Sequence, residues 1–205
     1  MERKALVIGA TLCGVTVALV GISLRREPPP AFPVTPPAPR EVGADLVGPV
    51  RVTVDASDPN RWVYFDFSRA SVVERPGPLD WDLGFRRFHV MVNGGQGFAG
   101  DGAVVDLGEA EFQSVTTAPD SGWVRGAARG DSVHPALDRW YDYGFTSHLL
   151  TPRPRVYALR TADRRFARLR FLSYYCTGAA PGCPTIEYVY QGNGSRDLDP
   201  TRTVR

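Results

Sequence analysis

Asp80 and Asp82, one on each side of Trp81, are the first side chains whose types and spacing could do chemistry. A close carboxylate pair can act in acid–base catalysis or hold a cation. Strand alternation, however, puts both carboxylates on one face and buries Trp81 between sheets. The sequence also shows no Ser or Cys nucleophile with a partnered His. We therefore predict a protein that is not an enzyme and has no catalytic residue.

A glycine-rich segment, Gly95–Gly100, formally matches a dinucleotide-binding fingerprint. That motif binds phosphate only where it follows a strand and opens a helix. The residues that follow it, from Gly102 to Val105, have the pattern of a strand instead. We therefore predict that the segment is a hairpin loop.

Two of the three cysteines, Cys176 and Cys183, flank a short loop that could close on itself. A disulfide there would stabilise the fold by about 2.5 kcal/mol on loop-entropy grounds. It would persist only in an oxidising compartment. No CxxC or Cys/His zinc spacing competes with this interpretation, so we predict no metal site.

The basic residues are unusual, because Lys4 is the only lysine among the 24 of them and the net charge is only +2. Such a small charge predicts no nucleic-acid partner. One stretch is dense in arginine. It could contact anionic lipid or an acidic partner, since arginine binds phosphate and carboxylate bidentately, or it could be a solvated strand face. Its members are Arg153, Arg155, Arg160, Arg164, Arg165, Arg168 and Arg170.

The run Ala5–Leu24 carries no charge and has charged residues on both sides. At 1.5 Å per residue these twenty residues span about 30 Å, which is one bilayer core. We predict a retained signal-anchor helix over residues 1–27, although a signal cleaved after Gly21 or Ser23 is an alternative. A lipoprotein signal fails, because Cys13 lies in the middle of the run. Small residues recur along one face of this helix and could pack against another helix, or could be ordinary membrane composition. They are Ala10, Gly14, Ala18 and Gly21.

Seven prolines lie in residues 28–48, which favours a polyproline II stalk that lifts the domain off the membrane or lies along a partner. Residues 49–190 then show short alternating runs, for example over residues 51–54, 61–67, 85–92, 103–107, 155–161, 165–175 and 185–190. This pattern predicts an all-β domain, an antiparallel sandwich or open barrel. Residues 191–205 are a polar tail that packs on something else or frays.

The order of several motifs resembles the HmuY family of secreted β proteins. They are Val52–Ser57, Trp62–Ser68, Asp80–Arg87, Asn93–Gly95, Gly102–Val104, Arg155–Arg160, Tyr174–Tyr175 and Tyr188–Tyr190. The resemblance covers about Val50 to Tyr190 and implies a fold of two antiparallel sheets. In the best-known members it implies haem capture outside the cell. It also indicates that Asp80 and Asp82 are structural.

The same resemblance implies two axial haem ligands, histidines or methionines, from loops before the Arg155–Arg160 strand. Haem iron needs such ligands on opposite faces of the ring. This chain offers His134 and His148 in that interval and no methionine. Neither matches the family register closely, and His89 would act from the wrong element. The resemblance therefore implies the fold more strongly than the activity.

Two functions follow. We expect first an accessory subunit of an inner-membrane complex, for example a respiratory or photosynthetic one. It would contact other membrane subunits and lipid through its helix and β domain and would need no cofactor. The alternative is a membrane-tethered haem-binding protein that uses His134 and His148. Both place the domain in the periplasm of a bacterium, on a single-pass inner-membrane anchor.

Overall fold

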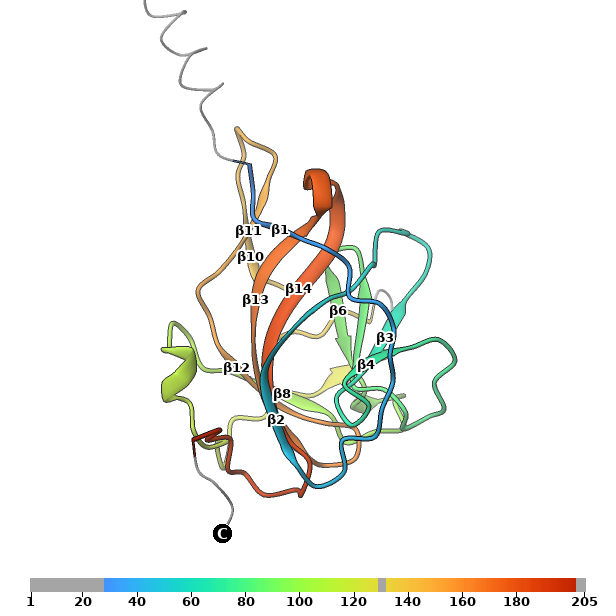
Figure 1. Cartoon of the computed structure of the whole chain (residues 1–205), viewed down its shortest axis with the longest axis vertical. Helices are drawn as coiled ribbons and strands as arrows, with labels where there is room; N and C mark the ends of the chain where they lie inside the picture. Colours follow the sequence, from blue (N-terminus) through green and yellow to red (C-terminus); the bar gives the residue numbers. More distant parts are fainter. Residues whose placement is uncertain (1–27, 129–131, 202–205) are drawn as a thin grey trace, which may run out of the picture.

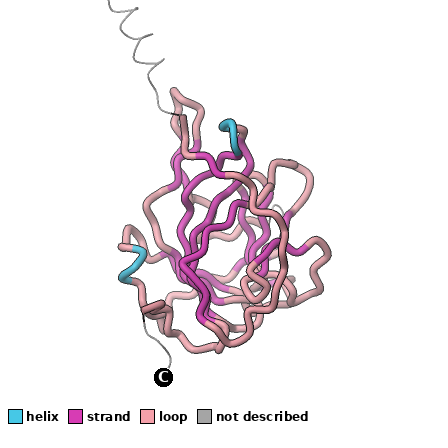
Figure 2. Tube along the Cα trace, viewed as in Figure 1, coloured by secondary structure: helices cyan, strands magenta, loops and turns pink. Residues whose placement is uncertain are grey.

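The computed structural model describes residues 28–128 and 132–201 of the 205-residue chain. In these residues a six-stranded and a four-stranded β-sheet face each other as a sandwich, with long loops at both ends, and two further sheets have two strands each (Figures 1 and 2). The predicted all-β fold with antiparallel sheets is confirmed. Helical structure in the described residues is limited to two short 3-10 turns.

The strands are short apart from β2, β13 and β14. Their bounds, with those of the two 3-10 turns, are β1 Ala31–Phe32, β2 Leu46–Thr53, β3 Val63–Asp66, β4 Ser71–Val73, β5 Leu83–Arg86, β6 His89–Val92, β7 Gly95–Gln96, β8 Ala103–Asp106, η1 Phe112–Ser114, β9 Gly126–Ala127, β10 Tyr141–Tyr143, β11 Leu150–Pro152, β12 Tyr157–Arg160, β13 Phe166–Cys176, η2 Thr177–Ala179 and β14 Pro181–Gln191.

The larger sheet has the strand order β2-β14-β13-β12-β8, and β1 adds to β13 in parallel. Its centre is the long antiparallel β13–β14 hairpin, which pairs from Phe166↔Gln191 to Tyr175↔Pro181. The second sheet has the order β4-β3-β5-β6. Aromatic rings close the space between the sheets, because Tyr188 of β14 makes edge contacts with Phe65 and Phe67 at centroid distances of 5.7 and 4.9 Å. These rings are buried and form the centre of the core.

Residues 85–92, predicted as one strand, form the end of β5 and all of β6. The prediction was wrong because the chain reverses at Arg87 and Phe88, so that Arg86 pairs with His89. Arg87 has a φ of 56°, a left-handed conformation that is uncommon outside glycine. Alternation of apolar residues cannot reveal such a turn when neither glycine nor proline marks it.

The proline-rich segment is bound to the domain along its length. Ala31 and Phe32 pair with the end of β13, and the Thr35 amide donates to the Thr53 carbonyl. Further along, the Val42 amide donates to the Ser68 carbonyl. The described part of the predicted stalk therefore lies along its own domain instead of extending away from it. Polyproline-like backbone leaves its amides and carbonyls free, so it can add to exposed polar groups of a β body.

The predicted polar tail also packs on the domain as far as residue 201. Leu198 is fully buried, and its amide donates to the Thr116 carbonyl. Gln191 donates its side-chain amide to the Asp197 carbonyl and holds the turn that leads there.

The predicted anchor helix and its packing face at Ala10, Gly14, Ala18 and Gly21 lie outside the described residues. Within residues 28–128 and 132–201, no helix is long and apolar enough to cross a membrane.

The disulfide between Cys176 and Cys183 is present, with a Cα–Cα distance of 4.9 Å, and the prediction is confirmed. It joins the last residue of β13 to β14 around η2. The bond ties the tip of the β13–β14 hairpin, at the end of the molecule where the β10–β11 hairpin also lies (Figure 1).

Candidate functional site

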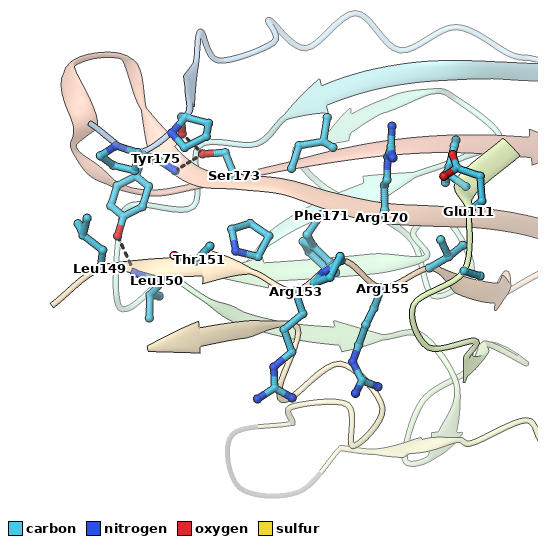
Figure 3. A pocket seen from close by; sticks show the side chains of 18 of the residues that line it. Glu111, Leu149, Leu150, Thr151, Arg153, Arg155, Arg170, Phe171, Ser173 and Tyr175 are labelled. Carbon is cyan, nitrogen blue, oxygen red and sulfur yellow. Dashed lines mark hydrogen bonds between the residues drawn. The ribbon is translucent and has the colours of Figure 1, made fainter. Parts of the chain in front are cut away.

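Two grooves flank the β10–β11 hairpin and share Leu149, Leu150 and Tyr175 as a common wall. We name the first the tyrosine groove, with a volume of about 500 Å³. It is lined by Arg87, Phe88, Tyr141, Tyr143, His148, Leu149, Leu150, Tyr174, Tyr175, Ala179 and Pro181. We name the second the proline groove, with a volume of about 590 Å³. It lies between Pro28–Pro30, η1, β11 and β13 (Figure 3). Both volumes are in the range of small-molecule sites.

Strand alternation in the β10–β11 hairpin decides which side chains face which groove. Tyr141 and Tyr143 share one face of β10 and line the tyrosine groove, whereas Asp142 faces the other way and forms an ion pair with Arg153 at 2.8 Å. The tip is closed by hydrogen bonds from the Gly144 amide to the Leu149 carbonyl and from the His148 amide to the Gly144 carbonyl. The hairpin is fixed to the sheet where the Leu150 amide donates to the Tyr175 hydroxyl at 2.8 Å.

The opposite wall of the tyrosine groove comes from the β5–β6 turn and from the turn at η2, which contributes Ala179 and Pro181. Phe88, in the β5–β6 turn, packs edge-on against Tyr141 at 5.5 Å between ring centroids. Arg87 beside it donates to the carbonyls of Ser57 and Pro181, so its charge meets backbone oxygens and no carboxylate there. Of the groove's lining residues, all of which the structure describes, Arg87 is cationic and none is acidic. The groove is therefore aromatic with one cation, which suits a flat anionic ligand.

Tyr143 and His148 form the polar pair of this groove. The Tyr143 hydroxyl lies 2.5 Å from His148 Nδ1, and the rings are 5.9 Å apart between centroids. Tyr143 is 54% exposed, and Phe145 at the tip is 85% exposed. A phenol oxygen and an imidazole nitrogen are both known iron ligands in haem proteins. The chemistry of this donor pair therefore fits haem on one side of the ring.

The other tyrosines of the groove are held differently. Burial raises the pKa of Tyr141, with a smaller contribution from Asp138. Burial also raises the pKa of Tyr174, although the nearby Arg87 opposes that shift. The Tyr175 hydroxyl accepts the Leu150 amide. These three rings therefore serve as walls of the groove.

In the proline groove the arginine side chains are paired with carboxylates of the protein. Arg155 pairs with Asp106 at 2.6 Å, and Arg170 pairs with Glu187 at 2.5 Å. Figure 3 shows the side chains of Arg153 and Arg155 extending away from Ser173 and Tyr175. The lining of this groove contains no His, Met or Cys, and the hydroxyl of its tyrosine, Tyr175, already accepts the Leu150 amide. The donor set of the proline groove therefore does not fit haem iron.

His134 and His148, predicted together as haem ligands, have different surroundings. His134 is fully buried, its Nε2 lies 3.1 Å from the Val124 carbonyl, and its Nδ1 accepts the Ala136 amide. Burial lowers the pKa of His134 to about 4, despite the hydrogen bond to Val124. Both ring nitrogens are thus used inside the fold. His134 does not line the groove that His148 lines.

His89, the remaining histidine, and its neighbour Met91 lie on β6. The His89 ring packs against Phe88 at 4.4 Å, and Met91 is buried over Gly84. Neither lines the tyrosine groove. Of the residues predicted for haem, His148 is therefore the one that the groove contains.

The predicted basic patch is divided among separate partners. Arg164 pairs with Asp101, Arg165 with Asp163, and Arg160 donates to the Asp101 carbonyl. Arg168 is fully buried, and the guanidinium groups of Arg168 and Arg170 each lie 4.8 Å from the centre of the Phe112 ring. Because η1 covers this face of β13, the arginines do not form one open cationic surface.

Asp80 and Asp82, the carboxylate pair first considered for catalysis, both accept hydrogen bonds from backbone amides. Asp82 is buried and accepts the amides of Phe67 and Ala162, and burial raises its pKa to about 8. Asp80 accepts the Gly77 amide. In the glycine-rich segment, an antiparallel bridge between Gly94 and Asp101 closes the predicted loop, but Gly95 and Gln96 within it form β7, which pairs in parallel with β9. The described residues contain no group of three or more His, Cys, Asp or Glu side chains that could hold a metal ion.

Two facing antiparallel sheets with an aromatic groove at one end define an all-β protein with a cleft for a small ligand. The family model described as HmuY protein matches residues 58–188, and the chain belongs to the HmuY family. The resemblance found in the sequence is confirmed. No curated protein matches the chain.

Solved structures share the fold at low identity. A proposed lipoprotein from Bacteroides fragilis is 20% identical, with a TM-score of 0.56 over 75% of this chain and 93% of the other. A proposed HmuY-like heme binding protein from Bacteroides vulgatus is 22% identical, with a TM-score of 0.56 over 74% and 98%. The apo HmuY analog from Tannerella forsythia is 14% identical, with a TM-score of 0.57 over 74% and 99%.

Sequence reasoning missed Tyr143 and Arg87. The run from Tyr141 to Phe145 alternates aromatic residues just before a glycine-containing turn, and this pattern could have suggested an exposed aromatic hairpin. Nothing in the sequence pairs Arg87 with that hairpin, because they are far apart in the chain.

Proposed function

We propose that this protein binds haem outside the cytoplasm, in the tyrosine groove, and does so without catalysis. The observation that carries the proposal is the exposed Tyr143–His148 pair in an aromatic groove whose one charged lining residue is Arg87. Haem is a flat, largely apolar ring with an iron and two carboxylates. The aromatic walls suit the ring, the pair suits the iron, and arginine suits a carboxylate.

Membership of the HmuY family supports this function, as does the likeness to a proposed heme binding protein of the same fold. The Cys176–Cys183 disulfide supports an oxidising compartment. Haem binding thereby moves ahead of the accessory-subunit hypothesis. The membrane anchor and the partner subunits expected through it stay predictions, since they depend on residues outside the described part.

Titration of the full-length protein with hemin, in mild detergent, tests the proposal by the shift of the Soret band. The wild type should give a saturable shift. The double variant Tyr143→Phe/His148→Ala should bind at least about 100-fold more weakly, because it removes the whole polar pair that would face the iron.

The matched control is Arg153→Gln, on the other side of the same hairpin, which should bind hemin like the wild type. A wild type that gives no Soret shift would refute haem binding. Equal binding by the double variant would refute the tyrosine groove as the site.

A further inference from the structure

We propose that Tyr143 is the iron ligand of this site and that His148 holds its hydroxyl in place, so that the chain binds ferric haem through a tyrosinate. This inference rests on the proposed function, but it makes a separate claim about which atom meets the iron. Neither the family match nor the sequence motifs assign a role to Tyr143.

The first step is that Tyr143 and His148 act from one side. Their donor atoms are 2.5 Å apart and hydrogen-bonded to each other. Two axial ligands must stand on opposite faces of a haem, and atoms this close cannot do so. The pair therefore supplies one ligand, and the other residue supports it.

The second step is that the backbone fixes Tyr143 more firmly than His148. Tyr143 lies in a regular strand opposite Leu150, whose amide is bonded to the Tyr175 hydroxyl. Alternation along β10 sends its ring into the groove beside Tyr141. His148 lies in the tip with a φ of 54°, and its Nδ1 is occupied by the phenol. The strand residue is thus the one whose aim the fold determines.

The third step is the proton. The Tyr143 hydroxyl lies 2.5 Å from His148 Nδ1, so the imidazole tautomer with its hydrogen on Nε2 would accept the phenol hydrogen there. Tyr143 would hold the iron through its oxygen, which would keep the electron pair of the broken O–H bond, and Nδ1 would be the nearest acceptor for the proton. Metal binding generally releases a proton from a ligand in this way. The His148 ring lies against Tyr143, whereas Tyr141 and Tyr174 pack against Phe88 and the Tyr175 hydroxyl accepts the Leu150 amide.

The ligand chemistry makes the site selective for the oxidised metal. An anionic oxygen is a hard ligand that favours Fe(III), and tyrosine is a known axial ligand of ferric haem. Adding a chemical reductant to the complex, which supplies one electron to each iron, should therefore release the haem.

Resonance Raman spectra of the full-length protein with ferric hemin test the inference, because iron-bound phenolate has its own vibrational bands. The wild type should show them. Tyr143→Phe should abolish them and weaken binding by more than about 100-fold, whereas His148→Ala should keep them and weaken binding by about 10- to 100-fold. The matched control Tyr64→Phe, on β3 outside the groove, should match the wild type. Tyr143 is exposed, so these variants should fold.

The outcomes separate the two proposals. If His148→Ala loses the ligand signature while Tyr143→Phe keeps the wild-type spectrum, the histidine is the ligand; the tyrosinate inference is then overturned and haem binding stands. If neither the wild type nor any variant binds hemin, the proposed function itself is overturned.

Discussion

The two grooves beside the β10–β11 hairpin have similar volumes but different chemistry. In the proline groove, Arg155 and Arg170 are already paired with Asp106 and Glu187. In the tyrosine groove, Arg87 donates to the carbonyls of Ser57 and Pro181 and hydrogen-bonds Tyr174, so its charge meets neutral oxygens, and the donor pair is exposed. An arginine that is already ion-paired binds a new anionic ligand less readily, because the ligand would have to displace the carboxylate. The comparison teaches that polar groups still open to a ligand identify a site better than volume does.

The largest expected effect is a loss of stability on replacing His134, and it should distinguish this histidine from His148, with which it was predicted to bind haem. His134→Ala should lower the free energy of unfolding by about 3 kcal/mol, because it empties a buried position and removes the ring's hydrogen bonds to the Val124 carbonyl and the Ala136 amide. Denaturant unfolding measures this loss. Hemin affinity of the folded variant should be unchanged, whereas His148→Ala should weaken hemin and leave stability nearly unchanged.

The same histidine predicts a pH dependence. The pKa of His134 is lowered to about 4, so the folded protein keeps it neutral while the unfolded chain protonates it near its usual 6.5. Its contribution to stability is therefore complete above about pH 6.5 and is lost as the pH falls toward 4. The difference in stability between wild type and His134→Ala should shrink across that range. A constant difference would show that His134 is not held neutral.

The next effect tests whether the tyrosine groove depends on its disulfide wall. Replacing both cysteines, Cys176→Ser with Cys183→Ser, should cost about 2.5 kcal/mol of stability through the entropy of the unfolded chain. Because Ala179 and Pro181 lie within the closed loop and line the groove, hemin should also bind several-fold more weakly. Thermal unfolding and hemin titration measure the two losses. Unchanged affinity would remove this loop from the site.

The smallest effect compares one charge in each groove. Arg87→Glu should weaken hemin binding by about 30-fold, since it replaces attraction of a carboxylate by repulsion. Arg153→Glu makes the same change in charge beside the proline groove and should alter hemin affinity less than about twofold. Titration at low and high salt should show the first effect shrinking with salt. Equal losses in both variants would erase the distinction between the grooves.

The sequence predicted the features that depend on local pattern or on motif order. Alternation located most strands, the Cys176–Cys183 spacing gave the disulfide, and the ordered motifs gave the family. It could not show the turn at Arg87, because a positive φ at arginine leaves no mark in the residue pattern. It also missed the parallel pairing of Ala31 with Tyr175, which joins distant segments.

The candidate site was harder to predict because three distant segments make it. Residues 87–88, 141–150 and 174–181 meet only when the two sheets pack. His148 was found through the resemblance, but Tyr143 becomes notable only beside it. His134 was predicted as a ligand because the sequence does not show whether the two ring nitrogens of a histidine are already hydrogen-bonded in the core, as those of His134 are.

The most direct test is to locate the iron itself. Crystals of the protein grown with ferric hemin, measured at the iron absorption edge, give the metal position from anomalous scattering without assuming a pose. We predict one iron peak in the tyrosine groove, within bonding distance of the Tyr143 hydroxyl oxygen. An iron peak in the proline groove, or beside any residue other than Tyr143 and His148, would contradict the assignment of the site.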